Sequence, residues 1–159
     1  MVNSENKGCL FALLGIFKEK KQEEIFPYER RYILTVNELS FYKVLKNNLP
    51  AEYSVFAKVR LEDIFKVIKG TEKWQSWRGR IKSRHIDFVI MEDANPMNII
   101  LIEIDDKSHN TVKAKEADQF KDKLAKITNT ELVRIKAKRS YSVDDLKPIF
   151  LTLMFDRLA

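Results

Sequence analysis

The sequence contains a single cysteine, Cys9, among its 159 residues. One cysteine cannot form an internal disulfide framework, and it also excludes a zinc site built from C-x-x-C pairs. This sparse use of cysteine fits a reducing, cytoplasmic setting. The sequence also lacks internal repeats and low-complexity segments, which excludes a repeat array.

The sequence has no strong signal for a membrane-spanning helix near its start. A spanning helix needs about 20 apolar residues, and the apolar run at 8–17 is too short. No small-residue cleavage site follows this run, so it is a poor signal peptide. Residues 1–24 therefore form a separate N-terminal segment with three open interpretations. It is a short helix that docks on the domain or on a partner, a membrane-surface anchor formed by residues 8–21 with its lysines, or a disordered lead.

Acidic residues are outnumbered by basic ones. There are 29 lysines and arginines against 23 aspartates and glutamates, which gives a net charge of +6. This excess favours a polyanionic partner such as nucleic acid. Hydrophobic residues make up 45% of the chain, and this fraction predicts one folded domain, which we place at residues 25–159.

The hydrophobic pattern predicts helices and strands in a mixed order. Thr35 and Glu38 form a capping box that begins a helix ending near Asn48. Strands follow at 53–60, 84–91 and 99–106, then a helix at 112–127, a strand at 131–136 and a last helix after Ser142. The short turn at 92–96 makes the second and third strands an antiparallel hairpin. We therefore expect an α/β or α+β domain with a mixed central sheet flanked by helices.

Acidic residues end one of the predicted buried strands. Side chains alternate between the two faces of a strand, so Glu103 and Asp105 continue a core-facing row. Pairing in the hairpin would bring Asp87 close to both. Carboxylates that converge repel one another unless a positive charge lies between them. The sequence therefore predicts a site for Mg²⁺ or Mn²⁺ held by Asp87, Glu103 and Asp105, with the alternative that the strand end faces solvent.

Glu38 and His109 each have two open interpretations. Glu38 caps its own helix, or it adds a further carboxylate around the metal. His109 acts as a general acid or base, or it caps the helix that follows it.

The stretch 66–84 is the most basic part of the chain. Lysine and arginine contact phosphates, and tryptophan rings can stack on bases. The alternative is a solvated loop whose tryptophans pack on the core. The candidate nucleic-acid-binding residues in this stretch are Lys73, Trp77, Arg78, Arg80, Lys82 and Arg84.

Asp87, a turn and then Glu103-x-Asp105 together resemble the PD-(D/E)xK nuclease-like fold, also called restriction-endonuclease-like. In that fold an aspartate on one strand and an acidic-x-lysine on the next hold Mg²⁺. The run 102–106 with His109 looks like the E-x-D-x-x-x-H variant found in bacterial relatives of mismatch-repair endonucleases. More narrowly, the chain resembles the bacterial domain of unknown function 2726 in segments 28–31, 34–42, 55–60, 85–89, 102–109 and 137–141.

The sequence departs from the nuclease pattern at one position, because Asp105 stands where the parent fold has lysine. That lysine helps to position or activate the attacking water. A substitute would come from Lys113, Lys123, Lys136 or His109. The family also often begins with a membrane helix, which suggests that the run at 8–17 is a shortened relic or an anchor.

The resemblance implies a Mg²⁺-dependent phosphodiesterase that acts on DNA, with Asp87, Glu103, Asp105 and His109 as catalytic residues. Two alternatives stay open. One is a catalytically inactive nuclease-fold module that binds nucleic acid, as the missing lysine suggests. The other is a scaffold tethered at the inner face of the membrane through residues 8–21.

Overall fold

The computed structural model describes residues 26–105 and 112–156. The chain divides into two compact units, Met1–Arg31 and Tyr32–Ala159. The larger unit contains the sheet and the helices discussed below. No helix within the described ranges is long and apolar enough to cross a membrane. The predicted N-terminal segment 1–24 lies outside the described residues.

Four strands form one mixed sheet in the order β1-β2-β3-β4. The first three strands pair antiparallel, and β4 runs parallel to β3. The predicted hairpin and the mixed sheet are therefore confirmed. The strands are β1 Tyr53–Arg60, β2 His85–Glu92, β3 Ile99–Asp105 and β4 Glu131–Lys136.

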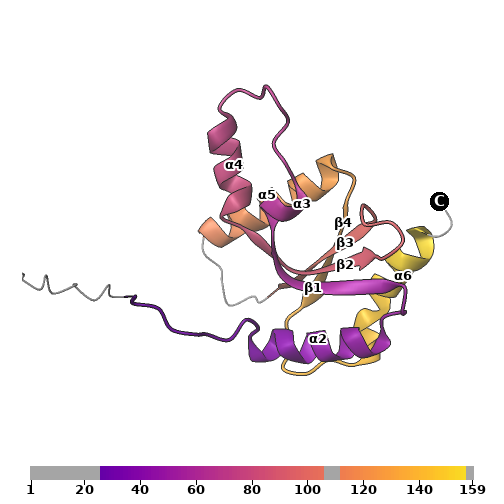
Figure 1. The fold of residues 1–159 in the computed structure, drawn as a ribbon. Helices are drawn as coiled ribbons and strands as arrows, with labels where there is room; N and C mark the ends of the chain where they lie inside the picture. The colour runs from indigo at the N-terminus through magenta and orange to yellow at the C-terminus, as the bar shows by residue number, and fades with distance from the viewer. Residues whose placement is uncertain (1–25, 106–111, 157–159) are drawn as a thin grey trace, which may run out of the picture. The chain divides into compact units, whose positions relative to one another are not determined.

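The helices cover both faces of this sheet (Figure 1). Two of them, α2 and α5, begin and end close to the residues that the sequence predicts. The basic stretch contains a helix, α4, that the sequence analysis did not assign. The helices are α2 Val36–Asn48, α3 Leu61–Ile64, α4 Trp74–Lys82, α5 Val112–Ile127, the 3₁₀ turn η1 Val143–Leu146 and α6 Lys147–Asp156.

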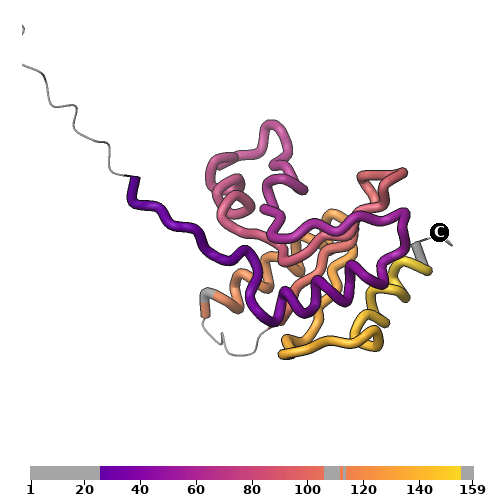
Figure 2. The backbone as a smooth tube through the Cα atoms, turned by 60° about the horizontal axis from the view of Figure 1, so that its bottom comes forward, coloured from indigo at the N-terminus to yellow at the C-terminus, as the bar shows by residue number. Residues whose placement is uncertain are grey.

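Two hydrophobic clusters fill the space between the sheet and its helices. On one face, α2, η1 and α6 pack on the sheet around Phe41, Phe88 and Ile102. On the other face, α3, α4 and α5 pack around Leu61 and Leu101. Figure 2 shows the same three layers from a second direction. Both faces of the strands are thus covered, as their continuous apolar runs predict.

The buried face of α2 differs from the predicted one. Helical spacing predicts a buried stripe of Leu39, Tyr42, Leu45 and Leu49. Leu45 is fully buried as predicted, but Leu39 is 43% exposed, and Phe41 is fully buried instead. Glu38 is also buried on this helix. The helix is therefore turned so that a charged residue faces the sheet, where a lysine meets it.

The alternation of side chains changes along β1 and β2 at one position. Val55 and Ala57 pack with the α2 cluster, but Val59 packs with the α3 cluster. Phe88 belongs to the first cluster and Ile86 to the second, although regular alternation along a strand would place both side chains on one face. The change coincides with Lys58, whose φ of 55° breaks the extended backbone.

Candidate functional site

A row of charged residues crosses the sheet where the hydrophobic core opens. Glu103 on β3 pairs with Arg134 on β4. The β2–β3 register, continued by one residue beyond Phe88 and Ile102, places Asp87 opposite Glu103. The β1–β2 register places Lys58 opposite Asp87, between the pairs on either side. Each of the four strands thus contributes one charge, and two acidic residues lie between two basic ones.

Asp87 joins three elements through its two carboxylate oxygens. Its Oδ1 accepts a hydrogen bond from Lys58 Nζ at 2.7 Å, and its Oδ2 accepts one from the backbone N–H of Ile104 at 3.0 Å. The paired residues of β2 and β3 end at Phe88 and Ile102. The carboxylate therefore satisfies a backbone donor at the point where the two strands separate, and the residue is only 9% exposed.

Glu103 is the most deeply buried acidic residue of the row. It is 6% exposed, and its Oε2 accepts a hydrogen bond from Lys121 Nζ at 2.6 Å. Its Oε1 is also buried and has no hydrogen-bond partner among the described residues. The pKa of Glu103 is raised to about 6, because burial and the nearby charge of Asp87 raise it more than Lys121 and Arg134 lower it. An unsatisfied buried oxygen of this kind is a costly feature that needs an explanation.

Glu38 both caps helix α2 and pairs with a lysine of the charged row. Its Oε2 accepts the backbone N–H of Thr35 at 2.8 Å, which completes the capping box. Its Oε1 accepts a hydrogen bond from Lys58 Nζ at 2.6 Å. The local cap and the link to the charged row are therefore combined in one side chain.

Asp105 lies in a different cluster from Asp87 and Glu103. Its Oδ1 accepts a hydrogen bond from Arg134 Nη1 at 2.6 Å. The same guanidinium donates to Asp122 Oδ1 from Nε at 3.0 Å and from Nη2 at 2.9 Å. Among the described residues, no three histidine, cysteine or acidic side chains are grouped closely enough to hold a metal. The structure thus brings Asp87 and Glu103 together and pairs Asp105 with arginine.

The structure describes only some of the predicted substitutes for the missing lysine. His109 lies outside the described residues, and so does the side chain of Lys113. Lys123 and Lys136 are exposed. Lys58 and Lys121 are the lysines that contact the buried carboxylates instead.

Sequence patterns could have identified one of these two lysines. Lys121 follows Phe120 directly and is one turn from Ala117 and Leu124, so helical spacing places it on the buried stripe of α5. Lys58 has no such signal, because its position depends on a backbone conformation that lysine rarely adopts.

His85 is a further residue of the site that the sequence analysis did not select. It is the first residue of β2, close enough to feel the charges of the row. Partial burial lowers the pKa of His85, and the positive charges of Lys58 and Lys121 lower it further. The imidazole is therefore neutral at neutral pH and can accept a proton.

The predicted nucleic-acid-binding residues lie on or beside α4. The guanidinium of Arg80 is 5.0 Å from the centre of the Trp77 ring and 4.7 Å from the centre of the Phe120 ring. Arg84 lies 4.9 Å from the same Phe120 ring. Stacking orders both guanidinium groups. Arg80 uses its faces in these contacts, and none of its guanidinium N–H donors has a partner among the described residues, so they are available for phosphate.

The other members of this set are less uniform. Arg78 is paired with Glu62, so part of its charge is already balanced. Lys73 and Lys82 are exposed, and Trp77 is 45% exposed. The helix therefore presents basic groups and two partly exposed tryptophan rings, Trp74 and Trp77, to solvent. It lies next to helix α5, which carries Lys121.

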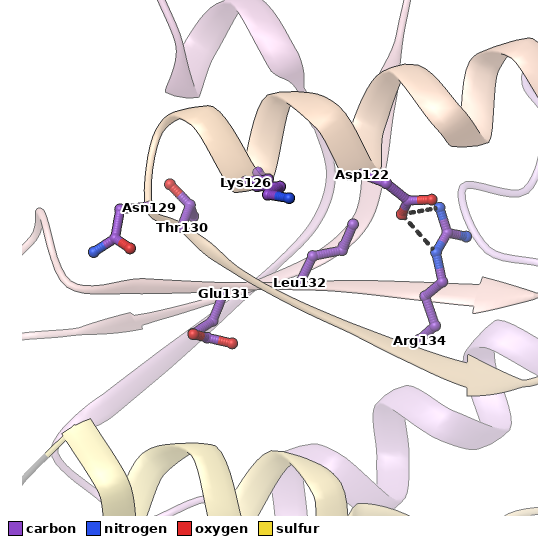
Figure 3. A pocket seen from close by; sticks show the side chains of 8 residues that line it. Asp122, Lys126, Asn129, Thr130, Glu131, Leu132 and Arg134 are labelled. Carbon is purple, nitrogen blue, oxygen red and sulfur yellow. Dashed lines mark hydrogen bonds and ion pairs between the residues drawn. The ribbon is translucent and has the colours of Figure 1, made fainter.

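A hollow of about 360 Å³ lies between the end of α5 and the start of β4. Figure 3 shows that polar side chains line it, with Arg134 bonded to Asp122 on one side. Glu131, at the start of β4, pairs with Ile100, whereas the charged row crosses β3 at Glu103. The hollow is therefore separate from Asp87 and Glu103 and shares only Arg134 with the row.

Comparisons with known proteins give one match. Residues 30–153 match the family model described as protein of unknown function, DUF2726. Neither a curated protein nor a solved structure matches the chain significantly. The family match includes all four strands, the charged row and helix α4. The chain therefore belongs to the DUF2726 family.

Proposed function

We propose that this domain is a divalent-cation-dependent phosphodiesterase of the PD-(D/E)xK type that acts on nucleic acid, with DNA as the first substrate to test. The observation that carries the proposal is Glu103. This buried carboxylate has one oxygen without a partner among the described residues, and it lies next to a second buried carboxylate, Asp87. A hard cation would complete this arrangement.

The residues present fit Mg²⁺ or Mn²⁺. Both ions prefer oxygen ligands, and carboxylates are the usual ones. Asp87 and Glu103 would hold the ion. Glu38 is a third carboxylate nearby, because Lys58 bonds to both Glu38 and Asp87. Asp105 is the next acidic residue along β3. A bound cation of this kind lowers the pKa of a coordinated water and offsets charge on a phosphate.

The protein groups around the carboxylates suit the same chemistry. Lys121 balances the charge of Glu103, and the neutral imidazole of His85 can accept a proton. The basic helix α4 would hold the phosphate backbone, which positions a substrate without reading its sequence. His109 stays the general acid or base that the resemblance implies.

A specific observation favours a second candidate, a nuclease-fold module that binds nucleic acid without cleaving it. Each of the three predicted metal-binding carboxylates already has a basic partner. Lys58 pairs with Asp87, Lys121 with Glu103 and Arg134 with Asp105. In this candidate the ion pairs are permanent, and α4 alone carries the function.

Cleavage of supercoiled plasmid DNA with Mg²⁺ or Mn²⁺ separates the two candidates. The enzyme hypothesis predicts nicking by the wild-type chain and none by Glu103→Gln. The variant Asp144→Asn, at an exposed pair on η1, is the matched control and should nick like the wild type. DNA binding without nicking by the wild-type chain would favour the binding module. Equal nicking by Glu103→Gln would contradict the role of Glu103 in cleavage.

The N-terminal segment carries a separate proposal about location. We propose a cytoplasmic domain that residues 8–21 hold at the inner face of the membrane. Flotation of the full chain with anionic vesicles tests it, compared with a chain that lacks residues 1–24. Equal flotation of both chains would eliminate the anchor.

A further inference from the structure

Lys58 occupies the space between two carboxylates that come from different elements. Its Nζ is 2.6 Å from Glu38 Oε1 on α2 and 2.7 Å from Asp87 Oδ1 on β2. The side chain of Lys58 is 24% exposed, against 11% for Glu38 and 13% for Asp87. A single ammonium group therefore balances two nearly buried negative charges.

The backbone of Lys58 is strained. Its φ of 55° lies in the left-handed region, although the residue is inside strand β1. For a residue with a Cβ this conformation is sterically unfavourable. The flanking residues Ala57 and Val59 stay in register with Phe88 and Ile86, so the strand continues on both sides. Strain confined to one residue of a polar site is a sign of function.

The contacts of Lys58 are those that a divalent cation would compete for. An ammonium group and a metal ion both bind carboxylate oxygens, and both cannot use Asp87 Oδ1 fully at once. Next to Asp87 lies Glu103, whose free oxygen is a further acceptor. A cation that binds these oxygens must therefore replace the charge that Lys58 supplies.

We infer that Lys58 is an internal counter-ion of this site. In the metal-free protein its ammonium group balances the charges of Glu38 and Asp87, and a divalent cation displaces it from Asp87. This inference rests on the proposed function. Lys58 would then supply a lysine to the site, although Asp105 stands where the nuclease pattern has one. A purely structural ion pair at Lys58 would differ from this counter-ion. It would hold α2 on the sheet, and metal binding would not affect it.

The test uses the full chain and Mn²⁺ as the probe. Calorimetric titration and thermal unfolding are measured for the wild type and for Lys58→Met. Lys138→Met is the matched control, because Lys138 is also paired with an acidic residue, Asp145, but outside the charged row. Lys58→Gln, which keeps a hydrogen-bond donor for Asp87, replaces Lys58→Met if that variant does not fold.

The inference predicts tighter Mn²⁺ binding by Lys58→Met, by about tenfold, because a charge-assisted hydrogen bond is worth at least that factor. Without metal the variant should melt below the wild type, since two carboxylates lose their counter-ion. Mn²⁺ should raise its melting temperature more than that of the wild type. Lys138→Met should bind Mn²⁺ like the wild type.

The outcomes distinguish this inference from the proposed function. Equal or weaker Mn²⁺ binding by Lys58→Met beside a wild type that binds would overturn the inference alone. Binding by the variant but not by the wild type would support the counter-ion and contradict a cation-dependent wild-type enzyme. Absence of binding in both chains would overturn both.

Discussion

Glu103 and Lys121 form a buried ion pair in which only one of the two carboxylate oxygens takes part. Lys121 Nζ contacts Oε2 at 2.6 Å, while Oε1 is buried without a partner among the described residues. Burial outweighs the attraction of the lysine, so the pKa of Glu103 rises from 4.5 to about 6. The site therefore holds a carboxylate that is costly to ionise until another positive charge arrives.

This raised pKa predicts a pH-dependent difference in stability between the wild type and Glu103→Gln. The folded state binds the proton more tightly than the unfolded state, so the contribution is fully present below pH 4.5 and is lost as the pH rises through about 6. Relative to Glu103→Gln, the wild type should lose about 2 kcal/mol between about pH 4 and about pH 7.5. Urea unfolding in EDTA measures this, and parallel pH profiles would contradict the burial argument.

Asp87→Ala should destabilise the protein strongly. The change leaves the backbone N–H of Ile104 unsatisfied and removes one partner of Lys58. Breaking a largely buried pair on one side costs about 3 kcal/mol. Asp144→Ala is the control, because its pair with Lys147 is mostly exposed and should contribute about 0–1 kcal/mol. Similar free energies of unfolding for the two variants would show that the Asp87 contacts contribute little.

Thr35→Ala and Glu38→Gln separate the cap of α2 from the charge of the site. Thr35 accepts the backbone N–H of Glu38, so its removal should cost about 1 kcal/mol of stability and leave Mn²⁺ affinity unchanged. Glu38→Gln keeps an acceptor for the cap but removes a charge beside Lys58, so it should change Mn²⁺ affinity. Denaturant unfolding measures the stability of both variants, and calorimetry measures their Mn²⁺ affinity. A change in Mn²⁺ affinity in Thr35→Ala but not in Glu38→Gln would contradict this prediction.

Arg80→Ala should weaken DNA binding and reduce its dependence on salt. The guanidinium is held by stacking, and its N–H donors have no partner among the described residues, so they can contact one phosphate. The slope of log affinity against log salt should therefore fall by about 1. Fluorescence anisotropy at several salt concentrations measures both quantities. Lys147→Ala, which also removes one basic charge, should keep the wild-type slope. An unchanged slope for Arg80→Ala would exclude a phosphate contact at this residue.

Much of the fold follows from local patterns in the sequence. The alternation along 99–106 and the apolar runs on both faces predict a covered strand, and the structure has β3 over Ile99–Asp105. Residue 106 lies outside the described residues. The capping box at Thr35 and Glu38 predicts where α2 begins, because its reciprocal hydrogen bonds are local. The predicted mixed sheet is confirmed as well.

The site is predicted less completely, because it depends on contacts between distant residues. Periodicity places Glu103 in a core-facing row, and it is buried there. The same row predicts Asp105 beside it, but Arg134 on β4 and Asp122 on α5 form a competing cluster. Alternation also fails at Lys58, where a left-handed backbone moves Val59 and Ile86 to the other hydrophobic cluster.

The most direct test of the site is calorimetric titration of Mg²⁺ and Mn²⁺ into the wild-type chain, Asp87→Ala and Glu103→Ala. If Asp87 and Glu103 hold a cation, the wild type binds at least one of the two metals and both variants lose that binding. Asp144→Ala should bind like the wild type. Binding that survives both changes, or a wild type that binds neither metal with or without DNA, would contradict the account.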